Sequence, residues 1–204
     1  MPDDTGQDPG RKHEKPGRKP RADVARNREK LLAAAREVFS EGGAEASLEA
    51  VVRRAGLGTG TLYRHFPTRE DLFQAVYAQV GDQLVALAGR LESAPDPDQA
   101  LRDWLRANIG MVATKRGMLA ALCAAPGSPD LFASLALRLR EAAERLMARS
   151  RAEGRLASDL TAEEVMRALF GICYTRETPG WQDTVTRLLD VFVDGLFAGP
   201  QSPR

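Results

Sequence analysis

Apolar residues recur at helical spacing along most of this chain, and no stretch shows the alternation typical of a half-buried strand. Alanine, leucine and arginine are abundant, whereas β-branched and aromatic residues are few, which also favours helix over strand. We therefore expect an all-α protein of about nine helices. The spacing is clear in the first apolar segment, which contains Val24, Leu31, Leu32, Ala35, Val38 and Phe39.

Capping and terminating residues divide the chain into these helices. Glycine or proline ends several of them, as at Gly42 and Pro67. Thr161 and Glu164 have the spacing of a capping box, and Ser128 stands where a helix cap belongs. The expected helices span residues 23–41, 48–54, 59–65, 69–91, 98–115, 117–124, 128–153, 161–175 and 181–198.

Charge is distributed unevenly, although the net charge is only +1. Residues 11–21 carry six Lys or Arg against one acid, and residues 1–22 contain almost nothing apolar. Such a segment cannot bury enough surface to order alone, so we expect a disordered basic arm that either contacts DNA near a minor groove or only solubilises the chain. The expected segments are the arm at 1–22, a small helical head at 23–67, a larger helical body at 68–198, and a tail at 199–204.

Two short helices joined by a glycine-containing turn at residues 55–58 predict a helix-turn-helix. In that motif the second helix lies in the major groove with its N-terminal residues toward base edges. Leu62 and Phe66 are four apart and should pack inward. Threonine can contact a base or a phosphate, and tyrosine and histidine suit phosphates. The residues left to face outward are Thr59, Gly60, Thr61, Tyr63, Arg64 and His65.

The stretch AGLGTGTLYRHFPTREDL at residues 55–72 resembles the signature of TetR-type repressors. NREKLLAAA at residues 27–35 and Phe39 also fit that family, and the match covers about residues 20–78. A weaker resemblance links the run at residues 154–160 to an actinobacterial-type branch of these regulators.

This resemblance implies a homodimer whose third helices enter two major grooves of a palindromic operator. Gly58 stands where the family often has a serine cap, and Thr59 where it often has lysine, which leaves the operator sequence open. Thr59 and Gly60 map onto variable base-facing positions. By the family pattern, the DNA-contacting positions are Ser47, Thr61, Tyr63, His65 and Arg69.

The body has the apolar walls and scattered polar groups of a small-molecule pocket, although a plain core has the same composition. The resemblance implies that a pocket exists, and the few charges favour an apolar or aromatic effector. The candidate pocket residues are Trp104, Asn108, Met111, Met118, Leu122, Phe132, Phe170 and Tyr174.

The last expected helix is apolar around more of its circumference than one core stripe requires. It is either wholly buried in one subunit or shared with a second subunit in a four-helix interface that includes the helix at 161–175. The two-fold logic of DNA half-sites favours the dimer. The candidate interface residues are Val165, Leu169, Val185, Leu188, Leu189, Phe192 and Leu196.

Other classes of function lack the residues they need. His65 has no partner at metal-ligand spacing, and the glycines at 56–60 follow a helix rather than a strand, which argues against a phosphate loop. We expect no catalytic group, metal or cofactor, and so neither an enzyme nor a ligand carrier. Cys123 and Cys173 stand in apolar stretches and should be reduced core residues. No signal peptide or membrane span is evident, so we expect a cytoplasmic protein without a membrane partner.

These observations favour a sequence-specific transcriptional regulator that binds double-stranded DNA. We expect a repressor that a small-molecule effector releases from a palindromic operator. The alternatives are a helical protein-binding adaptor, or a regulator or activator that answers to a protein partner.

Overall fold

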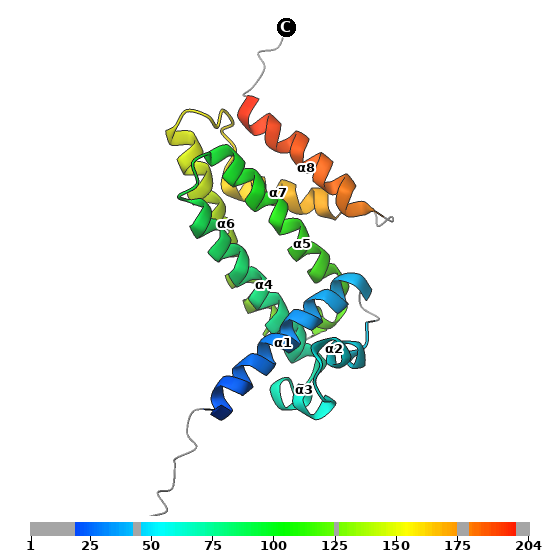
Figure 1. The fold of residues 1–204 in the computed structure, drawn as a ribbon. Helices are drawn as coiled ribbons and strands as arrows, with labels where there is room; N and C mark the ends of the chain where they lie inside the picture. The colour runs from blue at the N-terminus through cyan, green and yellow to red at the C-terminus, as the bar shows by residue number, and fades with distance from the viewer. Residues whose placement is uncertain (1–18, 43–45, 125–126, 175–179, 199–204) are drawn as a thin grey trace, which may run out of the picture.

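A computed structural model describes residues 19–42, 46–124, 127–174 and 180–198, and this part of the chain is all-α, as predicted (Figure 1). Its helices are α1 (Lys19–Gly42), α2 (Leu48–Ala55), α3 (Thr59–His65), α4 (Arg69–Leu91), α5 (Pro97–Ala124), α6 (Ser128–Ala152), α7 (Ala162–Cys173) and α8 (Trp181–Ala198).

The described residues contain eight helices where about nine were expected. The segments 98–115 and 117–124 belong to one helix, α5. The expected break lay beside Gly117. A single glycine lowers helix propensity by about 1 kcal/mol, which does not end a helix that packs against its neighbours.

The bounds of α3, α4 and α8 are those predicted, whereas α1 is longer than expected. It begins at Lys19, so the last residues of the expected arm, 19–22, are helical. The rest of that arm, residues 1–18, and the expected tail at 199–204 lie outside the described residues.

Two other helix ends also differ from the prediction. Ser128 is the first residue of α6 and not its cap. The cap is Gly127, whose φ of 77° is one that glycine adopts without strain. α7 ends at Cys173, before the expected end at residue 175, although it begins with the predicted capping box of Thr161 and Glu164.

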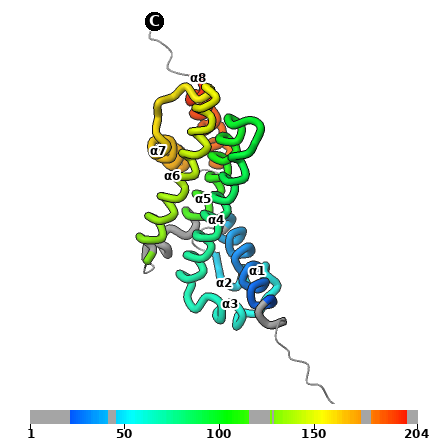
Figure 2. The backbone as a smooth tube through the Cα atoms, turned by 90° about the vertical axis from the view of Figure 1, so that its left-hand side faces the viewer, coloured from blue at the N-terminus to red at the C-terminus, as the bar shows by residue number. Residues whose placement is uncertain are grey.

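The helices form a small head and a long body. α1, α2 and α3 gather at one end, and α4 leads from α3 into the body, where it packs along α5 and α6 (Figures 1 and 2). α7 and α8 complete the body at the side away from the head (Figure 1). One hydrophobic cluster runs from the head into the body. None of the described helices is both long and apolar enough to cross a lipid bilayer.

The crossing of α4 and α6 is close because α4 has a glycine there. A Cβ atom added to Gly81 would lie 2.3 Å from Cδ1 of Leu135 on α6. Real Cβ atoms do not approach other heavy atoms so closely, so a larger residue would displace the Leu135 side chain or push the two helices apart. The missing side chain lets α6 pack directly on the helix that leads to the head.

Ion pairs fix α8 to α5. Arg106 Nε donates to Asp190 Oδ1 at 2.8 Å, and Arg102 pairs with both Asp190 and Asp194. The hydrogen bond from Arg106 holds the pKa of Asp190 below its usual value, and the same bond raises the pKa of Arg106. α8 is therefore held by polar contacts as well as by its apolar stripe.

Candidate nucleic-acid interface

The head has a small apolar core that supports α3. Leu62 and Phe66, predicted to face inward, are 1% and 4% exposed. Phe39 of α1 meets Phe73 of α4 edge to face, with ring centroids 4.5 Å apart. The guanidinium of Arg28 on α1 lies over the Phe66 ring, 5.4 Å from its centroid. These contacts hold α3 on one face and leave the opposite face open.

The turn between α2 and α3 depends on one glycine. Gly56 ends α2 with a φ of 65°, in the left-handed region that glycine adopts without strain. Its N–H donates to the carbonyl of Arg53, and Leu57 N–H donates to the carbonyl of Val52 at 3.2 Å. These bonds satisfy carbonyls at the end of α2, and the chain then enters α3 after Gly58, which provides no side-chain cap.

Six residues predicted to contact DNA lie on α3, around the part of the helix that the inward-facing Leu62 leaves open. Tyr63 is 50% exposed, so its ring and hydroxyl are accessible to a partner. Thr61 and His65 are half-buried at the edge of the face. The contact of these residues with DNA stays a prediction. The exposed members are Thr59, Gly60, Tyr63 and Arg64.

Ser47 and Arg69 have structural roles inside the head. Ser47 is the N-cap of α2, and its hydroxyl accepts from Ala50 N–H at 3.1 Å. Arg69 is half-buried: its Nη2 donates to the carbonyl of Ala46 at 2.7 Å, and its guanidinium lies 4.9 Å from the Phe73 centroid. The sequence motif alone did not indicate this anchoring role of Arg69. Contacts from Ser47 or Arg69 to DNA remain predictions.

Polar contacts join the head helices to one another and to the body. Arg54 Nη1 of α2 pairs with Glu41 of α1 at 3.0 Å and with Glu37 at 3.3 Å. The hydrogen bond from Arg54 lowers the pKa of the Glu41 carboxyl, and the pair raises the pKa of Arg54. Further along α1, Arg36 Nη1 donates to Gln83 Oε1 of α4 at 2.9 Å. A change in the position of α4 would therefore reach the head.

Asn108 is the most unusual of the predicted effector residues. It is fully buried on α5, and its Nδ2 donates to the carbonyl of Trp104 at 2.8 Å. The other amide atom, Asn108 Oδ1, has no hydrogen-bond partner among the residues that the structure describes. Trp104 Nε1 in turn donates to the carbonyl of Leu84 on α4 at 2.9 Å. A buried acceptor without a donor costs about 1–3 kcal/mol.

The other predicted effector residues are divided between the core and the surface. Met111 is buried on α5 like Asn108, whereas Tyr174, at the end of α7, is 44% exposed. Phe132 of α6 meets Tyr77 edge to face, with ring centroids 5.2 Å apart. Burial raises the pKa of the Tyr77 hydroxyl to about 12. The side chains of two candidates and one cysteine lie outside the described residues: Met118, Leu122 and Cys123.

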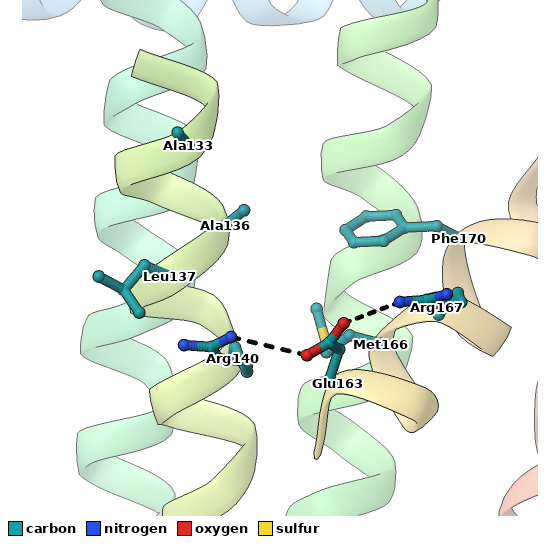
Figure 3. Close-up of a pocket in the computed structure, with 8 residues that line it drawn as sticks. All are labelled: Ala133, Ala136, Leu137, Arg140, Glu163, Met166, Arg167 and Phe170. Atoms are coloured by element: carbon teal, nitrogen blue, oxygen red, sulfur yellow. Dashed lines mark hydrogen bonds and ion pairs between the residues drawn. The ribbon is translucent and has the colours of Figure 1, made fainter. Parts of the chain in front are cut away.

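A groove between α6 and α7 contains the remaining candidate, Phe170 (Figure 3). Its volume is about 420 Å³. Sequence patterns do not indicate this groove, because its two walls belong to different helices and meet only in the fold. The lining residues are Ala133, Ala136, Leu137, Arg140, Glu163, Met166, Arg167 and Phe170.

The structure buries most of the predicted dimer-interface residues inside one protomer. These residues form the stripes by which α7 and α8 pack on the body, so they are not accessible to a second copy. Leu188 is 46% exposed, Phe192 is half-buried, and Val191, which the prediction omitted, is 71% exposed. The wide apolar band on α8 consists of a buried stripe that faces the body and an exposed stripe that faces solvent. The prediction did not distinguish these two stripes. The fully buried members are Val165, Leu169, Val185, Leu189 and Leu196.

The outward face of α3 has no metal site among the residues that the structure describes. No three or more potential ligands lie close enough together to hold a metal ion among the residues that the structure describes. Cys173 is buried in the core, as predicted. His65 lies beside Phe66, with ring centroids 6.2 Å apart, on the α3 side of the head.

Comparison with protein families assigns both parts of the chain. Residues 31–76 match the model "Bacterial regulatory proteins, tetR family". Residues 96–198, half of the chain, match "Transcriptional regulator SbtR-like, C-terminal domain". The head and the body therefore match two parts of one kind of protein.

Individual relatives agree with these matches. A solved TetR transcriptional regulator from Streptomyces coelicolor is 39% identical, with a TM-score of 0.75 over 86% of this chain and 99% of that one. A second, from Mycobacterium vanbaalenii, is 28% identical, with a TM-score of 0.61 over 87% and 98%. The HTH-type transcriptional regulator UidR of Escherichia coli is 47% identical over 62 residues, which are 30% of this chain and 31% of UidR. The chain thus spans about a third of the length of that curated relative.

Proposed function

The chain belongs to the TetR family of helix-turn-helix transcriptional regulators, which are not enzymes, and we propose that it is a cytoplasmic repressor released from DNA by a small-molecule effector. The observation that carries this proposal is the outward face of α3. A seven-residue helix held by Leu62 and the following Phe66 presents polar side chains and one large exposed ring, that of Tyr63. Such a surface suits the major groove of DNA.

The residues of α3 divide into two roles by their chemistry. Tyr63 and His65 contact phosphates, which fix the register of the protein on the duplex. Thr61 reads a base edge through its hydroxyl or its methyl group. Gly60, having no side chain, lets the helix approach the groove closely.

Two copies of the chain are required for a palindromic operator. The outer stripe of α8, where Leu188 and Val191 are exposed, supports a homodimer in which this stripe meets its two-fold mate. Each α3 then enters one major groove, and the half-sites lie one helical turn, about 34 Å, apart.

The effector site is centred on Asn108 in the body. A ligand hydroxyl or amine that donates to Asn108 Oδ1 would remove the cost of the unpaired acceptor. The amide is connected through Trp104 to the carbonyl of Leu84 on α4. Because α4 starts directly after the head, a shift of α4 changes the spacing of the two α3 helices. Effector and DNA then weaken each other's binding by the same factor.

The experiment that tests this function is selection of random duplexes by the purified full chain, followed by anisotropy titrations. We expect enrichment of a palindrome that binds two protomers. Tyr63→Phe should weaken binding to every duplex and lower its salt dependence, because a phosphate contact is lost. Thr61→Ala should instead relax the preference at one base pair in each half-site. The proposal is wrong if no sequence is enriched over the starting pool.

A further inference from the structure

We propose that the groove between α6 and α7 binds a small amphipathic anion, namely a monocarboxylate with an apolar tail. Asn108 is not among the residues that line this groove, and neither DNA binding nor an effector at Asn108 requires it. The volume of about 420 Å³ lies within the range of small-molecule sites.

The groove is polarised along its length. Each wall is one helix face with the spacing i, i+3, i+4, i+7, at positions 133, 136, 137 and 140 on α6 and 163, 166, 167 and 170 on α7. Figure 3 shows Ala133, Ala136 and Phe170 toward one end and Arg140 and Glu163 toward the other. The four positions on α6 span about 10 Å at 1.5 Å per residue. A ligand that fits both ends has an apolar tail of this length and a polar head.

The charged residues that line the groove, two arginines and one glutamate, favour an anionic ligand. Arg140 and Arg167 both point toward the same carboxylate, that of Glu163 (Figure 3). Arg167 Nη2 lies 2.7 Å from Glu163 Oε1, whereas Arg140 Nη1 lies 3.7 Å from Glu163 Oε2, too far for a hydrogen bond. Among the lining residues, two guanidinium groups share one carboxylate, so the groove keeps one excess positive charge. A ligand carboxylate can accept the bond that Arg140 does not make to Glu163.

The apolar end supplies the rest of the affinity. Phe170 is half-buried and lies toward this end, whereas Met166 is 6% exposed and lies beside Glu163 (Figure 3). Leu137 is 46% exposed on the α6 wall, so its side chain is accessible to a ligand. Covering Leu137 and Phe170 with a ligand tail contributes about 25 cal/mol per Å² of apolar area removed from water. A groove about 10 Å long matches the size of a small molecule, whereas a protein interface covers about 800 Å² on each partner.

The probe for this site is octanoate, with 1-octanol as the neutral control of equal chain length. Isothermal titration of the full chain without DNA should show saturable binding of octanoate and at least about tenfold weaker binding of octanol, because the alcohol makes no charge-assisted bond. Equal binding of the two compounds, or no binding of octanoate, would overturn the assignment. Because DNA is absent, a failure here is distinguishable from a failure of the proposed regulatory function.

Three substitutions locate the site. Arg140→Gln should weaken octanoate binding about tenfold, since it removes the head-group donor. Glu163→Gln should strengthen octanoate binding about two- to fivefold, because it removes the carboxylate that competes for both arginines. Arg138→Gln is the matched control: Arg138 also lies on α6 and pairs with Asp82 at 2.7 Å, away from the groove. Weaker binding in Glu163→Gln, or an equal loss in Arg138→Gln, would contradict the proposal.

A fourth variant separates the ligand from a second copy of the chain. Ala136→Trp fills the groove from an exposed helix position, so it should abolish octanoate binding and leave the oligomeric state unchanged. Light scattering of the eluting protein measures that state. If Ala136→Trp produced monomers, the groove would be a protein interface and the proposal would be wrong.

Discussion

The head and the body expose chemically different surfaces. In the head, α3 buries Leu62 and presents threonine, tyrosine and arginine to solvent. In the body, α8 buries an apolar stripe that includes Val185 and Leu189, and presents Leu188 and Val191 on its outer side. A polar face suits a charged polymer, and an apolar face suits another protein surface. The kind of partner that each helix can bind is therefore indicated by its exposed residues and not by its buried ones.

The largest effect is expected from breaking the support of α3. Leu62→Ala should cost about 3 kcal/mol of stability in the head, because it removes a fully buried side chain and leaves a cavity. Hydrogen exchange should show lost protection in α2 and α3 while α7 and α8 keep theirs, and DNA binding should fall with the head. Tyr63→Phe, on the exposed side of the same helix, is the control that leaves protection unchanged. Equal loss of protection in head and body would mean that the two regions are not separable.

The outer stripe of α8 is tested next. Leu188→Arg places a charge at the centre of the proposed dimer contact, where it would be desolvated without a partner. We expect monomers in light scattering and operator affinity reduced by about a hundredfold, which corresponds to about 2.7 kcal/mol. Arg187→Ala, at the neighbouring exposed position, should leave the dimer intact. A dimeric Leu188→Arg variant would refute the placement of the interface.

The sequence predicted the head more completely than the body. In the head, glycine and proline signals placed α3 correctly, and the spacing of Leu62 and Phe66 indicated its inward face. The anchoring of Arg69 on Ala46 was missed, because it joins residues that are 23 positions apart. Local capping rules contain no information about such contacts.

In the body, helix positions were predictable and helix faces were not. The bounds of α8 were correct, yet Val185 and Leu189 were assigned to the dimer surface although both are fully buried. Periodicity shows that an apolar band exists, but not which neighbour covers each side of it. The groove between α6 and α7 was missed for the same reason, since it exists only where two helices meet.

In the body, substitution of Asn108 should have a smaller effect, and it should stabilise the protein. Asn108→Leu should raise the melting temperature, because it replaces a buried unpaired acceptor by an apolar group of similar volume; the gain should be about 1–2 kcal/mol. Thr114→Val is the control, since the Thr114 hydroxyl is also buried but donates to Gly110 at 3.0 Å and should not stabilise when removed. Calorimetry measures both. A destabilised Asn108→Leu would show that the acceptor is satisfied in solution.

In the head, the smallest change in stability is expected from the ion pair between Arg54 of α2 and Glu41 of α1. The pKa of Glu41 is lowered in the folded protein by the hydrogen bond from Arg54, so the unfolded chain binds more protons at acidic pH. The stabilisation is present above the ordinary pKa of the carboxyl and is lost as pH falls through the lowered one. The melting temperatures of the wild type and Glu41→Gln should therefore differ at pH 7 and converge as the pH falls below the lowered pKa of Glu41. A difference that persists at acidic pH would exclude the ion pair as its cause.

The proposed function depends on two α3 helices that enter successive major grooves of one duplex. Methylation protection with dimethyl sulfate on a selected operator observes this contact, because guanine N7 lies in the major groove and adenine N3 in the minor groove. We predict two protected guanine clusters, one helical turn apart, that disappear with Leu62→Ala. A single protected cluster, or protection confined to adenine N3, would show that α3 does not bind DNA in this way.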